Sequence, residues 1–412
     1  MYRPRRFRYF RMRHARGAWA AASETAETKI PTAQVNQSPG GKGSMRVRRA
    51  VAEMAEYNPP TEMRAEEDYL LLDFSESTIP PSDAVVRAMQ DYVASGRVRM
   101  YPAYGTLTGK VAGYVGVRPE QVLIANGSDS AIQLIEHAIL DPGDEVVLPK
   151  PYFHIIGSTA ESIGARVVSP PYRPDFSYPF DEVVAAVTPR TRMIVVVNPN
   201  NPTGTSAPLE QVEALLRRFP GVCVFVDEAY YEFCGKTAVP LLAKHDNLVI
   251  SRTFSKAMAM AGLRFGYAVS NPDFIRQLAK LRIPYDVNSV ACAAAAASLE
   301  HPQPWQAYVA EVMGRAKPLV ERFLEEHGVP YVKSDCNFML IRDAAPAAVY
   351  AYLKERGILV RPQRQLPDYF RVSIGTVPEM QRFLQAYGDY LSGSPARPER
   401  RPAGQAASRT GS

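Results

Sequence analysis

The segment "RMIVVVNPNNPTG", residues 192–204, decides the fold class of this chain. Its first part is an unbroken apolar run rich in valine, which is typical of a strand buried on both faces. Its second part combines Asn, Pro and Gly, and this composition predicts a turn. The turn follows the carboxyl end of a buried strand, which is where open α/β sheets bind their ligands.

Similar apolar runs recur on both sides of this segment. They are "QVLIA" (121–125), "VCVFVDEA" (222–229) and "NLVISRTFS" (247–255), with amphipathic stretches such as "SAIQLIEHAIL" (130–140) between them. Strands that alternate with helices predict an α/β fold with a mainly parallel sheet. After residue 285 an alanine-rich segment and shorter strands predict a second, smaller α+β domain.

The bulk composition fits an ordinary globular enzyme. The chain has 412 residues, 46% hydrophobic and 22% charged, which suggests two or three domains. No apolar run is long enough to predict a membrane span. The four cysteines form no CxxC pair, so we expect neither a disulfide nor a metal site, but reduced thiols in a cytoplasmic protein.

The net charge of +6 is unevenly distributed. Residues 1–50 hold 12 of the 48 Lys and Arg but 2 of the 42 Asp and Glu, so the remaining chain carries a net charge of −4. A mildly acidic folded part gives no reason to expect nucleic-acid binding. The basic arm is predicted to be disordered. It is interpreted as an unstructured tail or a translated leader before Met45 in preference to a transit peptide.

The motif "NGSD" (126–129) lies between a predicted strand and a predicted helix. Gly127 lets the backbone approach a ligand closely, and a helix N-terminus suits a phosphate. The alternative is that Ser128 or Asp129 caps the helix.

Asp227 ends the apolar run of residues 222–226. A buried carboxylate requires a positive partner, and a protonated pyridine nitrogen would be one. Tyr230 could then reach a phenolic oxygen of the same ring. The alternative role for Asp227 is that of a helix cap.

Lys256 is the one lysine in "SRTFSKAMAMAGLRFG" (251–266). A lysine that forms an imine must lose its proton, which partial burial and nearby cations promote. Thr253, Ser255 and Arg264 offer hydroxyls and a guanidinium, a combination that holds a phosphate dianion. The pattern indicates a lysine that reacts with a phosphorylated aldehyde.

Seven motifs in one order make the family resemblance plain. The chain resembles the fold-type I pyridoxal-phosphate aminotransferases, above all the histidinol-phosphate aminotransferase branch, over residues 72–384. The motifs are "NGSD", "PGDEVVLPKPYF", "NPNNPTG", "DEAY", "SRTFSKAMAMAGLRFGY", "RIPYDVNSVA" and "FRVSIGT". The resemblance implies a homodimeric enzyme of amino-acid biosynthesis that uses pyridoxal 5'-phosphate.

The resemblance also implies a division of the chain into five parts. These are a basic arm (1–50), a substrate-contacting segment (51–100), a large cofactor-binding domain (101–285), a small domain (286–391) and a disordered tail (392–412).

Roles for residues around the cofactor follow from the resemblance. It implies that Lys256 forms the imine and later moves a proton, and that Asp227 pairs with the pyridinium nitrogen. Phe153 stacks on the ring, with Tyr152 as the alternative because the next aromatic position of the family is Ile156. The further cofactor contacts are Asn201 and Tyr230 at the ring hydroxyl, Gly127, Ser128, Asp129, Thr253, Ser255 and Arg264 at the phosphate, and Tyr101 at the phosphate of the partner subunit.

The substrate contacts implied are Arg371 for the α-carboxylate and Arg361 for a distal phosphate or second carboxylate. Glu76 is retained in the N-terminal substrate segment. That segment departs from the family pattern, however, because residues 75–79 read "SESTI" and Ile79 replaces a tyrosine. Isoleucine cannot hydrogen-bond a phosphate, so the substrate is less certain than the cofactor.

Ping-pong transamination between a histidinol phosphate-like donor and 2-oxoglutarate is therefore the leading hypothesis. Two alternatives keep the same cofactor: a diverged amino-acid aminotransferase of specialised metabolism, and a decarboxylase or lyase similar to threonine-phosphate decarboxylase. A non-catalytic binding protein is disfavoured because Lys256, Asp227 and Arg264 are all present. The expected partners are small molecules and a second copy of the chain, with neither nucleic acid nor membrane.

Overall fold

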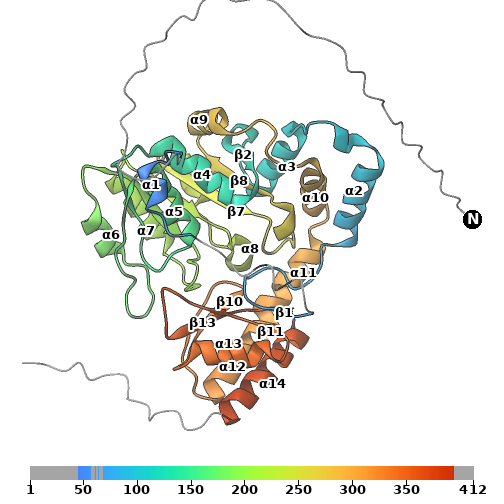
Figure 1. Ribbon diagram of the computed structural model, residues 1–412. Coiled ribbons are helices and arrows are strands. Elements are labelled where there is room, and N and C mark those ends of the chain that lie inside the picture. Colours follow the sequence, from blue (N-terminus) through green and yellow to red (C-terminus); the bar gives the residue numbers. More distant parts are fainter. Residues whose placement is uncertain (1–44, 57–60, 62–63, 65–67, 394–412) are drawn as a thin grey trace, which may run out of the picture. The chain divides into compact units, whose positions relative to one another are not determined.

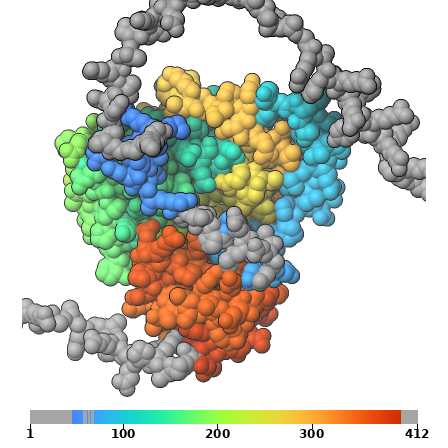
Figure 2. All heavy atoms as spheres, in the orientation of Figure 1, coloured from blue at the N-terminus to red at the C-terminus, as the bar shows by residue number. Residues whose placement is uncertain are grey.

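The computed structural model describes residues 45–56, 61, 64 and 68–393. The predicted arm and tail lie mostly outside these residues. The chain divides into two units, Met1–Val47 and Arg48–Ser412, and the second unit carries all the features below. At its start Arg48 donates a hydrogen bond to the carbonyl of Ile163 at 3.0 Å, and helix α1 (Arg49–Ala52) lies against α5 (His154–Ile163). Figure 2 shows this blue segment on the green and teal surface of the central elements.

Seven strands of the described part form one sheet in the order β2-β8-β7-β6-β5-β3-β4 (Figure 1). Strand β8 is antiparallel to both of its neighbours, and the other pairs are parallel. The predicted α/β fold with a mainly parallel sheet is confirmed. The strands are β2 (Val122–Ala125), β3 (Glu145–Val147), β4 (Arg166–Val168), β5 (Thr191–Val197), β6 (Cys223–Asp227), β7 (Leu248–Thr253) and β8 (Gly266–Ser270).

Both faces of the sheet are covered, which explains why its strands are continuously apolar. Successive side chains alternate between two clusters: Val224 and Val226 belong to one, and Phe225 to the other. The first cluster includes residues of α2 (Asp83–Ala94), α3 (Gly105–Val115), α7 (Leu209–Arg218) and α10 (Ser289–Glu300). The second includes residues of α4 (Gly127–Ile139), α5 and α9 (Pro272–Leu281). Helix α6 (Phe180–Ala186) follows β4.

The C-terminal elements build a separate apolar cluster around an antiparallel sheet of order β12-β13-β10-β9. Residues of α8 (Tyr231–Cys234) and of the segment near Leu72 join this cluster. Strand β1 (Leu70–Leu71) pairs in parallel with β11 (Ile358–Leu359). The remaining elements are β9 (Tyr331–Val332), β10 (Phe338–Arg342), β12 (Arg361–Pro362), β13 (Tyr369–Ser373), α11 (Gln303–Glu311), α12 (Lys317–Glu326), α13 (Pro346–Lys354) and α14 (Val377–Gly393).

The predicted domain boundary at 285/286 stays a prediction. Helix α10 packs with the first cluster of the large sheet, whereas α11 contributes Tyr308 to the C-terminal cluster. No helix among the described residues is both long enough and apolar enough to cross a membrane.

Candidate active site

The polar residues of the site follow the carboxyl ends of β2, β5, β6 and β7. These four strands run in the same direction, since the antiparallel β8 lies between β2 and β7. Their ends therefore meet at one edge of the sheet. Gly127, Asn201, Asp227 and Lys256 are brought to this edge although they are distant in sequence.

Lys256 is partly buried just beyond β7. Its Nζ donates a hydrogen bond to the carbonyl of Phe74 at 2.9 Å and lies 5.6 Å from the ring centre of Tyr230. Burial, and after it the nearby Arg371 guanidinium, are the main causes that lower the pKa of Lys256 to about 8. A substantial fraction of the amine is thus unprotonated at mildly alkaline pH, as a nucleophile requires.

Asp227 is the last residue of β6 and is buried. Its Oδ1 accepts a hydrogen bond from the hydroxyl of Ser251 at 2.6 Å. Burial raises the pKa of Asp227 and the Ser251 hydrogen bond opposes this rise, so that the pKa lies at about 6. A carboxylate in this position fits a cationic ring nitrogen, because the desolvated charge needs a positive partner.

The predicted phosphate cup is assembled at the start of α4. Gly127 has φ +77°, and a Cβ at this position would come within 2.6 Å of Arg264 Nη2. The same nitrogen donates to Asp129 Oδ2 at 2.8 Å. Shortly before Arg264 in the sequence lie the two hydroxyl residues of the predicted cup, Thr253 and Ser255. The Thr253 hydroxyl donates a hydrogen bond to the Ser255 hydroxyl at 2.8 Å, and both residues are buried. Glycine, guanidinium, hydroxyls and a helix N-terminus form a donor set suited to a phosphate dianion.

A cavity of about 630 Å³ lies beside Lys256. It brings together seven residues singled out in the sequence, namely Tyr152, Phe153, Asn201, Tyr230, Lys256, Arg361 and Arg371. Tyr152 and Phe153 both line it, with the ring of Tyr152 against Gly157, and Ile156 is buried in the core. The choice between the two aromatic rings for stacking stays a prediction.

Arg371 lines this cavity, and hydrogen bonds fix its guanidinium. Its Nη1 donates to Asn201 Oδ1 at 2.5 Å and its Nη2 to the carbonyl of Asp73 at 2.9 Å. Its Nε is buried without a hydrogen-bond partner among the described residues. The guanidinium of Arg361 lies over the ring of Phe74, 4.8 Å from the ring centre. Two arginines thus line one cavity, and one of them retains an unpaired donor.

Glu76 and Tyr101 are placed elsewhere. Glu76 forms an ion pair with Arg64 and lines a second cavity of about 500 Å³, to which Ser255 also belongs. Tyr101 is 76% exposed and stacks on Tyr285 with ring centres 4.1 Å apart. Neither side chain is among those that line the cavity beside Lys256.

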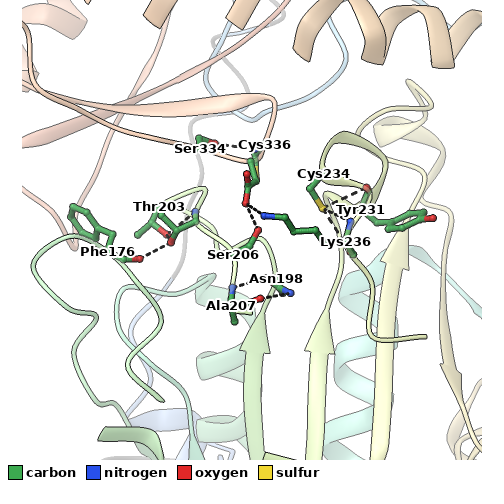
Figure 3. A network of polar contacts seen from close by, with 12 residues as sticks. Phe176, Asn198, Thr203, Ser206, Ala207, Tyr231, Cys234, Lys236, Ser334 and Cys336 are labelled. Atoms are coloured by element: carbon green, nitrogen blue, oxygen red, sulfur yellow. Dashed lines mark hydrogen bonds and ion pairs between the residues drawn. The ribbon is translucent and has the colours of Figure 1, made fainter. Parts of the chain in front are cut away.

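Sequence patterns did not point to a polar network next to the Asn-rich turn (Figure 3). Asp335, in the loop between β9 and β10, accepts hydrogen bonds from Ser206 at 2.5 Å and Lys236 at 2.7 Å. Its amide donates to the carbonyl of Gly204 at 2.7 Å. This network ties the C-terminal sheet to the turn that carries Asn201. The motif "NPNNPTG" indicated the turn that forms one part of this network. No sequence pattern indicated the part around Asp335.

The amino-acid sequence is similar to that of a known enzyme family and of several of its members. A model of the family "Aminotransferase class I and II" matches residues 67–386. The histidinol-phosphate aminotransferase of Methylobacillus flagellatus is 36% identical over 357 residues, covering 83% of this chain and 96% of the relative. That of Moorella thermoacetica is 33% identical over 341 residues, covering 79% of this chain and 86% of the relative.

A solved structure supports the fold independently. The histidinol-phosphate aminotransferase from Sinorhizobium meliloti, in complex with pyridoxal-5'-phosphate, has a TM-score of 0.77 at 23% identity, covering 85% of this chain and 99% of that one. The predicted family, fold type and cofactor are confirmed. The chain thus belongs to the class I and II aminotransferases, and it is a pyridoxal phosphate-dependent transaminase of fold type I.

Proposed function

We propose that this transaminase exchanges an amino group between a histidinol phosphate-like donor and 2-oxoglutarate in two ping-pong half-reactions. The observation that carries the proposal is the shared cavity of Lys256 and Arg371, in which the pKa of the lysine is lowered to about 8. A reactive amine next to a fixed guanidinium can hold a carboxylate and move a proton within one site. The names of the relatives supply the donor class.

The residues at the sheet edge fit the cofactor. We assign Asp227 to the ring nitrogen, Tyr230 and Asn201 to the ring hydroxyl, and Phe153 to the ring face. The phosphate is assigned to the cup, whose crowding of Arg264 against Gly127 leaves no room for a side chain. When bound, pyridoxal phosphate supplies an electron sink for negative charge at the substrate Cα.

The side chains of this chain then divide the remaining work. Lys256 accepts the proton from the substrate Cα as a general base and returns it as an acid. Arg371, which lines the cavity, binds the carboxylate, and Arg361 binds a distal anionic group. Asn201 orients Arg371 through the 2.5 Å hydrogen bond.

The identity of the amino donor is a proposal, because the N-terminal substrate segment (residues 75–79) differs from the family pattern. Ile79 packs against the C-terminal apolar cluster and is not among the residues that line the cavity beside Lys256. Glu76 lies in the second cavity. A diverged amino-acid aminotransferase and a threonine-phosphate decarboxylase-like lyase remain the alternatives, and their products separate them: a keto acid in one case, an amine and carbon dioxide in the other.

We also propose a cytoplasmic homodimer with shared sites. Tyr101 projects from a surface with other exposed apolar side chains, including Met100, Ile283 and Tyr285. The second cavity opens next to Ser255 of the phosphate cup. A partner's Tyr101 reaching this cavity would complete the cup. The four cysteines are free thiols, as expected in a reducing compartment.

A half-reaction screen tests the donor assignment. Purified protein with bound cofactor is mixed with one donor at a time, at matched concentration, and the absorbance of the bound cofactor is followed. Histidinol phosphate, glutamate, aromatic and basic amino acids form the first set. Rapid conversion by histidinol phosphate supports the proposal. Silence with histidinol phosphate and conversion by another donor would contradict it and identify the true donor class.

A further inference from the structure

Ser251 is a buried hydroxyl to which the proposed mechanism gives no role. It lies in β7 and is 0% exposed. Its register partner in β6 is Asp227, and its Oγ donates to Asp227 Oδ1 at 2.6 Å. The hydroxyl therefore reaches the carboxylate that we assign to the cofactor ring.

The sheet does not need this hydrogen bond. The backbone at Ser251 is already paired with β6 on one side and with β8 on the other. Its carbonyl accepts a hydrogen bond from the amide of Glu228 at 2.9 Å. An alanine would satisfy the same strand position, so the side-chain oxygen needs a separate explanation.

The surroundings of Asp227 disfavour its ionised form. Burial is the largest effect, and the carboxylates of Asp129 in α4 and Glu228 on the same strand end act in the same direction. Lys256 favours ionisation, and the phenol of Tyr230 also faces the group. The hydrogen bond from Ser251 is the largest influence that favours the carboxylate, and the balance leaves its pKa at about 6.

We propose that Ser251 is a positioning residue that keeps Asp227 ionised and fixes one of its oxygens, so that the other remains available to the cofactor ring nitrogen. This inference rests on the proposed role of Asp227. A hydrogen bond to a charged acceptor is stronger than one between neutral groups, and it selects the charged form. Ser251 thereby extends the cofactor site by one residue behind the carboxylate.

Ser270 provides a matched control. It is also a buried serine, in the neighbouring strand β8, and its hydroxyl donates to the backbone carbonyl of Leu248 at 2.6 Å. Ser251→Ala and Ser270→Ala each delete one buried hydroxyl from the same sheet. Only the first deletion removes a hydrogen bond to a titrating group.

The test is the pH dependence of pyridoxal phosphate binding, measured by equilibrium dialysis of cofactor-depleted protein. Loss of the Ser251 hydroxyl should raise the pKa of Asp227, so affinity should fall at a higher pH than in the wild type. A charged hydrogen bond corresponds to an upward shift of the acid midpoint by about one to two pH units. Ser251→Cys has a weaker donor of similar size, so its acid midpoint should lie between those of the wild type and Ser251→Ala. Ser270→Ala should keep the wild-type midpoint.

A second readout does not depend on the cofactor. Infrared titration of the cofactor-free protein follows the protonated carboxyl band that Asp227→Asn removes, and this band should appear at higher pH in Ser251→Ala and Ser251→Cys. Equal midpoints in wild type, Ser251→Ala and Ser251→Cys would overturn the inference while leaving the proposed function intact. A wild-type protein whose cofactor affinity is unchanged by Asp227→Asn would instead overturn the proposed role of Asp227, and the inference with it.

Discussion

Arg371 donates a hydrogen bond to the side-chain oxygen of Asn201 at 2.5 Å, which joins strand β13 to the turn after β5. Arg371 belongs to the C-terminal sheet, whereas Asn201 lies in a turn that follows the large sheet, and the two residues lie far apart in sequence. Their contact holds the guanidinium to which we assign substrate binding beside a residue that we assign to the cofactor ring. The geometry of the site thus depends on how the C-terminal sheet meets the large one, and four predictions examine its parts.

The phosphate cup should not tolerate a side chain at Gly127. Gly127→Ala places a methyl group where Arg264 Nη2 lies and requires φ +77°, which non-glycine residues rarely adopt. We expect at least a roughly tenfold weaker affinity for pyridoxal phosphate and a loss of about 1 kcal/mol or more in the free energy of unfolding. Dialysis and urea unfolding measure the two effects.

Gly113→Ala is the control for this change. Gly113 is an exposed residue inside α3, with no atom within 4 Å of an added Cβ. Alanine should stabilise the helix there by about 0.5–1 kcal/mol and leave cofactor affinity unchanged. Equal effects of the two substitutions on affinity would contradict the cup.

The rate at which the protein binds pyridoxal phosphate should depend on the protonation state of Lys256. The unprotonated amine is the nucleophile, so the rate at which cofactor-free protein takes up pyridoxal phosphate should rise with pH, with a midpoint near the lowered pKa of about 8. Arg371→Gln removes a cation that lowers this pKa, so its midpoint should move upward. Burial remains, so the midpoint should stay below the ordinary value of 10.5. Stopped-flow absorbance measures both.

Arg361→Gln is the comparison for that experiment. Arg361 lines the same cavity, but its guanidinium lies over Phe74. The midpoint should therefore stay close to that of the wild type. A midpoint in Arg371→Gln at or below the wild-type value would show that the guanidinium does not act on the lysine.

The Asp335 network should affect substrate binding more than chemistry. Asp335→Asn and Lys236→Met each break the 2.7 Å ion pair between these two side chains. The pair is partly exposed, so its coupling energy should be below about 1 kcal/mol, which limits the rise in KM to roughly fivefold. We expect kcat to stay unchanged, because Asp335 touches the turn through Ser206 and Gly204 and is not among the residues that line the cavity beside Lys256.

Lys110→Met serves as the matched surface change. Lys110 pairs with Glu300 between α3 and α10, at a comparable exposure. The substitution Lys110→Met should leave KM unaltered. A double-mutant cycle of Asp335→Asn with Lys236→Met that gives no coupling in KM would argue against the network as a link between the two sheets.

Mixing two impaired variants, at a cofactor concentration that does not saturate Tyr101→Ala, tests shared sites. Lys256→Ala lacks the reactive amine and should lose at least about a thousandfold in turnover while retaining its fold. Tyr101→Ala should bind the cofactor more weakly. If Tyr101 acts on the partner's site, subunit exchange creates one intact site per mixed dimer and restores roughly a quarter of wild-type activity. No recovery after verified exchange would place Tyr101 outside the neighbouring site.

Local sequence predicted those parts of the site that belong to a single strand end. Continuous apolar runs marked β5, β6 and β7, and residues at or just beyond their carboxyl ends, such as Asp227 and Lys256, lie at one edge of the sheet as expected. The contacts of Arg371 with Asn201 and Asp73 could not be predicted, because they depend on how two sheets pack together. The hydrogen bond from Ser251 to Asp227 likewise could not be predicted, because it depends on how β7 pairs with β6.

The N-terminal substrate segment shows the same limit. The expectation that Glu76 contacts the substrate stays a prediction. Its ion pair with Arg64 could not be predicted, because no periodic pattern in the sequence indicates it. The role that we propose for Tyr101 requires a second copy of the chain. Residue identity suggested these roles, while the position of each side chain was fixed by long-range packing.

The pairing of β1 with β11 has a consequence for synthesis on the ribosome. Leu70 and Leu71 emerge early, but their partners Ile358 and Leu359 leave the exit tunnel only when most of the chain has been made. The large sheet can assemble during translation, since all its strands precede residue 271. The C-terminal sheet and the Arg371 contact can form only after β13 has emerged, so a nascent chain that still lacks β13 would expose the apolar face around Leu72, to which chaperones can bind.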